Sequence, residues 1–250
     1  MLTLFAFGLL AACVFAFQLP CGVVLQPGDP LFVNASRIDN ARVQRTPSLV
    51  LMAACEADVV ASVQWARQQN ASISVLAGGH SAEGFSVGAK SVVLSVRGLQ
   101  TFALDRATNV LTAGAGFKFA ELYARLSAID ETLLLVGGGC PDVGVGFFAG
   151  GGLSFLTRAL GLGSDSILSL RVVLANGTAV ATSRTRHRSL FNALLAGGGG
   201  NFGVITQFDI QLHRAFSAAQ QVCFASGSDL DQLAQLIAIY GDWLVDPATP

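Results

Sequence analysis

One stretch of the chain, from Gly137 to Asp165, restricts the possible folds more than any other. Eight of the sixteen residues from Gly137 to Gly152 are glycine, and Cys140 lies among them. Glycine loses much backbone entropy on folding and is favoured where the main chain takes a positive φ or approaches another group closely. The run therefore predicts a main chain that binds an extended, partly anionic ligand through its backbone N–H groups.

The residues between these glycines argue against the alternative, a glycine-rich loop in solvent. Four apolar side chains are interleaved with the glycines and would be poorly placed in water, namely Val143, Val145, Phe147 and Phe148. The apolar run after Gly152 predicts a helix, and the dipole at its N-terminus would favour an anionic ligand at the same place. We therefore expect a binding loop that is followed by a helix.

The overall composition narrows the class of protein. The chain has 250 residues, of which 52% are hydrophobic and 12% charged, and its formal net charge is -1. This length allows one large domain or two smaller ones, and the low charge fraction argues against a disordered chain. Because the charges nearly balance, no nucleic-acid partner is expected.

The N-terminal residues form a separate segment. Residues 1–17 are almost entirely apolar and carry no charge. The segment is short for a membrane span, and we predict a signal peptide with Val14 and Ala16 at its cleavage site. An uncleaved membrane anchor is the alternative, because no Lys or Arg stands near Met1. The prediction is a secreted, extracellular protein that is not attached to a membrane after cleavage.

Two further patterns agree with export from the cell. Three N-glycosylation sequons begin at Asn34, Asn70 and Asn176, so we expect a glycoprotein. Cys21 and Cys55 could form a disulfide in an oxidising compartment, although the sequence alone does not establish this pairing.

The periodicity of the apolar residues predicts a mixed order of strands and helices. The expected strands are 48–52, 73–76, 91–96 and 204–212, and the expected helices are 56–69, 117–129 and 190–196. Two hairpins are expected, one turning at residues 106–108 and one at Asn176-Gly177, a dipeptide that suits a type I′ turn. Because strand and helix do not alternate regularly, the fold class is α+β.

The end of the chain has a different pattern. Residues 229–244 predict an amphipathic helix that leads into the last residues. We expect residues 215–250 to be the beginning of a second, α+β domain that is incomplete in this chain.

Taken singly, the short motifs carry little weight. Residues 198–203 have G-x-G-x-x-G spacing, but a helix precedes them and a strand follows, the reverse of the order in a dinucleotide-binding fold. His80 alone would be a structural or solvated histidine, and Cys140 alone a small buried hydrophobic residue. Neither a zinc-ligand spacing nor a Ser-His-Asp order occurs, so no metal is expected.

Taken in order, the motifs are specific. A strand leads to GGHS at 78–81, a Cys-Pro-x-Val-Gly-Val-Gly loop begins at Cys140, GGG at 150–152 leads to GLGSD, and an Ala-Asn-Gly hairpin precedes GGGGNFGVIT at 197–206. This order resembles the berberine bridge enzyme-like FAD-linked oxidases, which belong to the vanillyl-alcohol oxidase superfamily. The resemblance covers residues 45–214 and implies a PCMH-type FAD-binding domain made of two small α/β subdomains.

The resemblance implies how FAD is held. In that family the histidine of the GGH loop is bonded covalently to the 8α-methyl carbon of the flavin, which here is His80. In bicovalent members the cysteine of the second loop is bonded to flavin C6, which here is Cys140. A neutral imidazole and a thiolate are suitable nucleophiles for an electron-poor ring. The resemblance assigns backbone contacts with FAD to Gly78, Gly79, Ser81, Gly144, Gly146, Gly151, Gly152, Gly203 and Val204.

An activity is implied as well. A substrate CH–OH group would lose a hydride to FAD, and O2 would take the electrons to give hydrogen peroxide. Val143 matches the valine of family oxidases at a position that controls oxygen access. Because bicovalent members oxidise sugars, an oligosaccharide is the expected substrate, with alkaloids, other alcohols and secondary metabolites as alternatives. The alternative functions are a dehydrogenase with another electron acceptor and a truncated FAD-binding module without turnover.

The sequence departs from the family in three respects. Leu76 stands where an arginine is usual, two residues before the GGH. Phe147-Phe148 replaces the residues usual after the V-G-V-G run, so the lining near the flavin ring is expected to differ. The family's catalytic base comes from a C-terminal half that we expect to be missing here, and Tyr123 and Tyr240 do not match its motif. No catalytic residue is therefore assigned.

Overall fold

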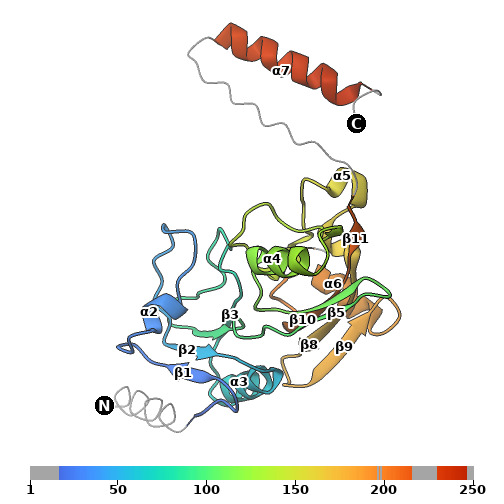
Figure 1. The fold of residues 1–250 in the computed structure, drawn as a ribbon. Helices are drawn as coiled ribbons and strands as arrows, with labels where there is room; N and C mark the ends of the chain where they lie inside the picture. Colours follow the sequence, from blue (N-terminus) through green and yellow to red (C-terminus); the bar gives the residue numbers. More distant parts are fainter. Residues whose placement is uncertain (1–16, 196, 198, 216–229, 247–250) are drawn as a thin grey trace. The chain divides into compact units, whose positions relative to one another are not determined.

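The computed structural model describes residues 17–195, 197, 199–215 and 230–246. It divides into two compact units after Ala215, which we describe separately. The first unit contains a four-stranded sheet, a five-stranded sheet and a short two-stranded one with helices beside them, so the α+β class is confirmed (Figure 1). The predicted signal peptide lies outside the described residues, apart from Phe17.

The N-terminal part of the first unit is a four-stranded sheet with the strand order β1-β2-β4-β3. Strands β2, β4 and β3 are parallel, and β1 joins the edge in the antiparallel direction. Helix α3 is the crossover from β2 to β3, which run parallel in this sheet on either side of β4. The bounds are β1 Val23–Leu25, α2 Phe32–Ala35, β2 Leu49–Met52, α3 Glu56–Gln68, β3 Ile73–Leu76 and β4 Val92–Ser95.

The second sheet has five antiparallel strands in the order β5-β6-β10-β8-β9. Side chains along β10 alternate between buried and half-buried, as expected for a strand with one face in the core. The bounds are β5 Phe102–Asp105, β6 Val110–Gly114, β8 Ile167–Val173, β9 Ala179–Ser183 and β10 Val204–Gln211. The strands expected from the sequence, and the helices expected at 56–69, 117–129 and 190–196, are confirmed to within a few residues.

The hairpin between β8 and β9 is confirmed, but the expected type I′ turn is wrong. Gly177 has φ 82°, whereas Asn176 is not among the residues with positive φ. The N–H of Gly177 donates to the carbonyl of Leu174 at 2.8 Å, and the N–H of Leu174 donates to Thr178 at 2.9 Å. This is the three-residue loop in which a type I turn is followed by one left-handed glycine.

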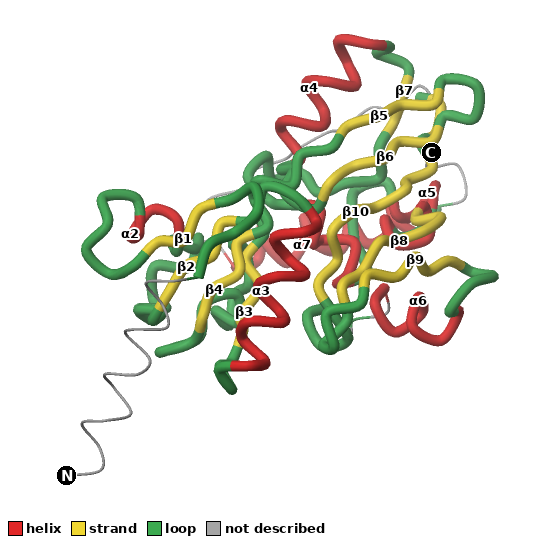
Figure 2. Tube along the Cα trace, turned by 90° about the horizontal axis from the view of Figure 1, so that it is seen from below, coloured by secondary structure: helices red, strands yellow, loops and turns green. Residues whose placement is uncertain are grey.

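Several helices and short elements surround the second sheet. Figure 2 shows α3 lying between the two sheets, with α4 and α6 on other sides of the five-stranded sheet. Strands β7 and β11 pair with one another. The bounds are α4 Phe119–Ile129, β7 Leu133–Leu134, η1 (a 3-10 helix) Val145–Gly150, α5 Thr157–Leu160, η2 (also 3-10) Gly163–Ser166, α6 Arg188–Leu195 and β11 His213–Arg214.

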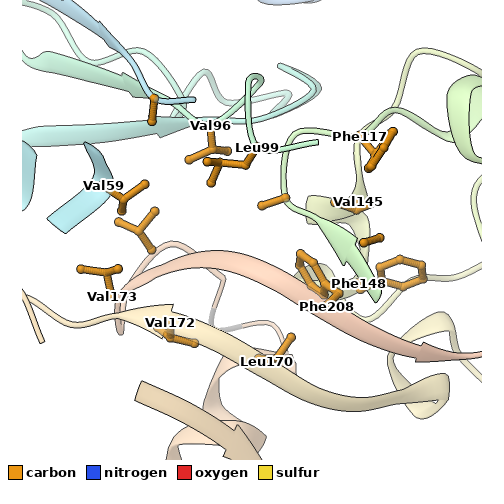
Figure 3. Close-up of a cluster of buried hydrophobic side chains, with 14 of the residues drawn as sticks. Val59, Val96, Leu99, Phe117, Val145, Phe148, Leu170, Val172, Val173 and Phe208 are labelled. Carbon is orange, nitrogen blue, oxygen red and sulfur yellow. The ribbon is translucent and has the colours of Figure 1, made fainter. Parts of the chain in front are cut away.

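One hydrophobic core is shared by both sheets. Figure 3 shows side chains from α3 and from the residues after β4 facing those of β8 and β10. Val59, Val145, Phe148 and Phe208 are at most 1% exposed. Two residues of the glycine-rich stretch therefore lie in the core, which excludes the alternative that this stretch is a loop in solvent.

The helix expected from the apolar run after Gly152 is present only as one short turn, and it does not begin at the glycines. Helix α5 contains only Thr157–Leu160, and the side chains of Leu153 and Phe155 are 76% and 82% exposed. The hydroxyl of Thr157 accepts from the N–H of Ser154, and the hydroxyl of Ser154 accepts from the N–H of Leu156. Such local bonds compete with helix formation. Without a helix of several turns, the expected helix dipole does not contribute to binding an anionic ligand at this place.

The cysteines expected to pair and the three sequon asparagines lie among the described residues. Cys21 and Cys55 form a disulfide with a Cα–Cα distance of 6.1 Å. Asn34, Asn70 and Asn176 are all exposed. None of the helices among the described residues is long and apolar enough to cross a membrane.

The second unit contains helix α7, Leu230–Val245, which confirms the helix expected at 229–244. Its exposed side chains include Leu233, Ile237 and Tyr240. The ring of Tyr240 stacks on that of Trp243 with the centroids 5.8 Å apart.

Candidate cofactor site

Two glycine loops, far apart in the sequence, touch through their backbones. The first is residues 77–81, which follow β3, and the second is residues 137–144, which follow β7. A methyl group on Gly78 would lie 2.4 Å from the backbone nitrogen of Gly144. A methyl group on Gly144 would lie 2.8 Å from the nitrogen of Gly78. No side chain fits between them, so glycine is required at both positions.

In the first loop, the backbone carbonyls of residues 77–79 are hydrogen-bonded, whereas the N–H groups of residues 78–80 are not bonded to any described residue. The carbonyls of Ala77 and Gly78 accept from the guanidinium of Arg97, and the carbonyl of Gly79 accepts from the N–H of Asp39 at 3.0 Å. The peptides are trans, so each N–H points away from the carbonyl of its own peptide unit. Within the described part of the chain, the N–H groups of Gly78, Gly79 and His80 have no acceptor.

The second loop is held by the first turn of α4. The N–H of Phe119 donates to the carbonyl of Val143 at 2.9 Å, and the N–H of Ala120 donates to that of Pro141 at 3.0 Å. The first N–H groups of a helix lack partners within the helix, and here the loop supplies them. The phenolic hydroxyl of Tyr123 donates to the carbonyl of Gly138 at 2.8 Å, and burial raises the pKa of Tyr123 to about 12.

An aromatic cluster lies beneath the second loop. The ring of Phe119 stacks on that of Tyr123 and meets those of Phe147 and Phe148 edge to face, with centroids 5.2 and 5.8 Å apart. Phe148 in turn contacts Phe208 of β10. The two phenylalanines that depart from the family pattern therefore join the loop to the core, and Phe148 is fully buried.

Further glycines extend the site beyond these two loops. Gly151 and Gly152 have φ values of 100° and 81°, and their carbonyls accept from the N–H groups of Ser164 and Gly163. A methyl group on Gly151 would meet nothing within 4 Å, so its outer side is open. The third glycine segment, residues 197–203, contacts η1 where a methyl group on Gly199 would lie 3.0 Å from Ala149.

His80 and Cys140 belong to the two loops that touch. The side chain of His80 is 22% exposed, and its Nδ1 lies 3.7 Å from Oδ2 of Asp39 beside a cavity of about 380 Å³. Cys140 is exposed and is the free cysteine of the described residues. A hydrogen bond from Lys118 lowers the pKa of Asp142, a residue of the second loop.

Some of the other predicted site residues lie near the two loops, and others lie farther away against β8. The hydroxyl of Ser81 accepts from the N–H of Phe85. A methyl group on Gly146 would lie 4.0 Å from the side chain of Ala77. Val143 is half-buried and packs against the core. Gly203 and Val204 lie against β8 instead of at the contact of the first two loops, and Val204 is 6% exposed in the core. Their predicted contact with FAD stays a prediction.

Sequence reasoning missed two groups that shape the first loop. Arg97 and Asp39 hold the loop carbonyls, but each lies outside a recognisable motif. An arginine two residues after a buried strand is the signal that could have pointed to Arg97.

The donor set fits FAD. Consecutive free N–H groups at residues 78–80 suit phosphate oxygens or flavin carbonyls, and the positions without a Cβ allow close approach of a large planar ligand. Two nucleophilic side chains, His80 and Cys140, stand on the loops that form this surface.

Comparison with known proteins agrees with this arrangement. Residues 47–183 match the family profile described as FAD binding domain. The (R)-6-hydroxynicotine oxidase of Paenarthrobacter nicotinovorans is 33% identical over 193 residues, which are 77% of this chain and 42% of that protein.

Two solved structures are also similar. BBE-like 1 of Physcomitrella patens is 31% identical with a TM-score of 0.75, and the match covers 82% of this chain and 44% of that one. The xylooligosaccharide oxidase of Myceliophthora thermophila C1 is 27% identical with a TM-score of 0.73, covering 81% and 42%. The chain thus spans less than half the length of these relatives.

Proposed function

Because the chain belongs to the FAD binding domain family, whose members here include berberine bridge enzyme-like proteins, we propose that it is the FAD-binding part of an oxidase acting on CH–OH groups. Bound FAD supplies a two-electron acceptor that takes hydride from the substrate and returns the electrons to O2 as hydrogen peroxide. The protein's part is to bind the cofactor, orient it and exclude competing reactions. Family membership confirms the resemblance on which the sequence-based prediction rests.

The observation that carries the proposal is the contact between Gly78 and Gly144. It brings the loop of His80 and the loop of Cys140 to one surface, where the N–H groups of residues 78–80 are free to donate. Gly79, Ser81, Gly146, Gly151 and Gly152 complete the set of positions that we assign to backbone contact with FAD.

The cofactor is held by two covalent bonds in this proposal. His80 would hold FAD through its ring nitrogen at the 8α carbon, giving up its N–H proton, and Cys140 would hold it through its sulfur at C6, giving up its thiol proton. FAD would supply the two-electron oxidation that each bond requires, with O2 as the final electron acceptor. The exposed thiol of Cys140 and the partly exposed ring of His80 are both accessible for this chemistry.

Val143 controls access of oxygen in this proposal. Its backbone carbonyl accepts from the N–H of Phe119, and its half-buried side chain packs against the core. A bulkier side chain there would exclude O2 and convert the oxidase to a dehydrogenase.

The proposed substrate is an oligosaccharide. Support comes from the solved xylooligosaccharide oxidase, which is similar over 81% of this chain. The nicotine oxidase among the relatives favours a second candidate, a nitrogen heterocycle that is oxidised by the same cofactor.

Secretion and N-glycosylation are part of the proposal. The disulfide between Cys21 and Cys55 and the exposure of Asn34, Asn70 and Asn176 support it. A protein recovered from the medium should lose mass when treated with an N-glycosidase. Recovery inside the cell, without glycans, would contradict this part.

Turnover tests the activity. The protein is expressed with whatever coding sequence follows Pro250 in its gene, and panels of oligosaccharides, other alcohols and nicotine-like amines are added without oxygen. An oxidase substrate bleaches the flavin absorbance, and admission of air restores the colour and forms hydrogen peroxide. Val143→Leu should bleach equally but recolour at least about tenfold more slowly, if one obstructed contact costs about 1.4 kcal/mol. If none of these compounds bleaches the flavin absorbance, the proposed activity is contradicted.

A further inference from the structure

Arg97 lies behind the first glycine loop and binds three carbonyls of two segments. The residue follows β4, and its Nε donates to the carbonyl of Ala77 at 2.9 Å. Its Nη2 donates to the carbonyl of Arg37 at 2.9 Å and, more weakly, to that of Gly78 at 3.5 Å. One planar guanidinium thereby connects the end of β3, the glycine loop and the segment before Asp39.

The guanidinium of Arg97 fits closely against Gly79 and has no acidic partner among the described residues. A methyl group on Gly79 would lie 3.0 Å from Nη2 of Arg97, so glycine at this position leaves room for the guanidinium. No carboxylate of the described chain forms an ion pair with Arg97. Burial lowers the pKa of Arg97, and neutral carbonyl dipoles are what stabilise its charge. Such hydrogen bonds to a charged donor are stronger than neutral ones.

The bonds of Arg97 determine which way the loop peptides face. With the carbonyls of Ala77 and Gly78 directed to the guanidinium, the N–H groups of Gly78 and Gly79 face the opposite side. The bond from the N–H of Asp39 to the carbonyl of Gly79 does the same for the N–H of His80. Arg97 also holds the segment of Asp39 in place through the carbonyl of Arg37.

We propose that Arg97 is the positioning residue of His80: it orients the Gly78-Gly79 peptides so that the imidazole is presented to the cofactor. The proposal rests on the proposed function, since it assigns FAD to this surface. It predicts a selective effect, because Arg97 makes no bond to the second loop. Loss of Arg97 should impair the bond at His80 and spare the bond at Cys140.

The test compares Arg97→Met and Arg97→Lys with Arg67→Met, an exposed arginine of α3. Each protein is digested, and mass spectrometry measures the fraction of flavin on the His80 peptide and on the Cys140 peptide. In Arg97→Met, flavin on the His80 peptide should fall about tenfold or more, the size expected when hydrogen bonds to a charged group are lost. Flavin on the Cys140 peptide should be unchanged, Arg97→Lys should recover part of the loss, and Arg67→Met should match the wild type.

A second readout does not depend on flavin. Hydrogen exchange of the Asp39 amide, which is bonded to the carbonyl of Gly79, should be about tenfold faster in Arg97→Met than in Arg67→Met. Equal losses of flavin on both peptides, no loss on either, or unchanged exchange at Asp39 would overturn the role of Arg97. A wild type that carries no covalent flavin but shows the faster exchange in Arg97→Met would contradict the proposed function and leave the positioning of the loop by Arg97 supported.

Discussion

Arg171 of β8 and Glu56, the first residue of α3, form an ion pair through two hydrogen bonds, 115 residues apart in the sequence. The hydroxyl of Thr206 in β10 also donates to the Glu56 carboxylate at 2.7 Å. Helix α3, which follows β2 of the four-stranded sheet, is thus joined to the five-stranded sheet by a polar contact. The hydrogen bonds from Arg171 lower the pKa of Glu56.

Glu56→Gln should therefore destabilise the first unit and change its response to acid. Because the pair is partly exposed, we expect a loss of about 1 kcal/mol in the free energy of unfolding. The folded pKa lies below the ordinary value of 4.5, so the stabilisation is present above that pH and is lost as the pH falls through the lowered pKa. Urea unfolding of the variant and the wild type at neutral and acidic pH measures both effects.

Glu131→Gln, at an exposed glutamate, is the matched control and should leave the unfolding curve unchanged. If the difference between Glu56→Gln and the wild type stays constant from neutral pH down to the pH at which both unfold, the ion pair does not stabilise this junction.

The contact between Gly78 and Gly144 predicts a strict requirement for glycine. Gly78→Ala places a methyl group 2.4 Å from the nitrogen of Gly144, so one loop must move. We expect a loss of about 3 kcal/mol in stability and of most bound flavin. Gly150→Ala is the control, because its methyl group would meet nothing within 4 Å. Thermal unfolding and flavin absorbance of the purified variants report the result, and equal behaviour of the two variants would refute the contact.

Tyr123 supports the second loop as a hydrogen-bond donor. Tyr123→Phe leaves the carbonyl of Gly138 without its donor and should cost about 1 kcal/mol of stability. Because burial raises the pKa of Tyr123 to about 12, its contribution is complete below the ordinary value of 10.0 and is lost as the pH rises through 12. Absorbance titration of the phenolate in the wild type and Tyr123→Phe gives the difference. A Tyr123 that ionises near 10 would contradict its burial.

The disulfide should contribute much of the stability of the N-terminal edge. Cys21 and Cys55 are separated by 34 residues, and closing a loop of this size is worth about 4 kcal/mol in the chain-entropy view. Buried Asp58 accepts from the N–H groups of Cys21 and Cys55, so the carboxylate orders the same junction. Cys21→Ser should lower the unfolding temperature as much as a reductant does in the wild type. A reductant that has no effect on the wild type would show that the bond does not form.

The secondary structure was predictable wherever one apolar periodicity runs through a segment. Strand β10 and helix α3 each have such a pattern, and both lie where expected. The segment after Gly152 has apolar residues without a buried partner, and the hydroxyls of Ser154 and Thr157 bind nearby N–H groups instead. Composition alone did not distinguish a helix from this series of turns.

The site was predictable only in part, because its motifs identify residues and not contacts. The order of the glycine motifs indicates His80 and Cys140, yet only the fold shows that Gly78 and Gly144 touch. Arg97 was missed because its effect depends on carbonyls brought together by tertiary structure.

The central claim is that the junction of the two glycine loops holds FAD covalently through His80 and Cys140. Acid precipitation of the purified protein tests it most directly, with flavin absorbance read in the pellet and in the supernatant. The account predicts colour in the pellet for the wild type, for His80→Ala and for Cys140→Ala, and colour in the supernatant or none for the double variant. Colour in the supernatant of the wild type, or no flavin at all, would contradict it.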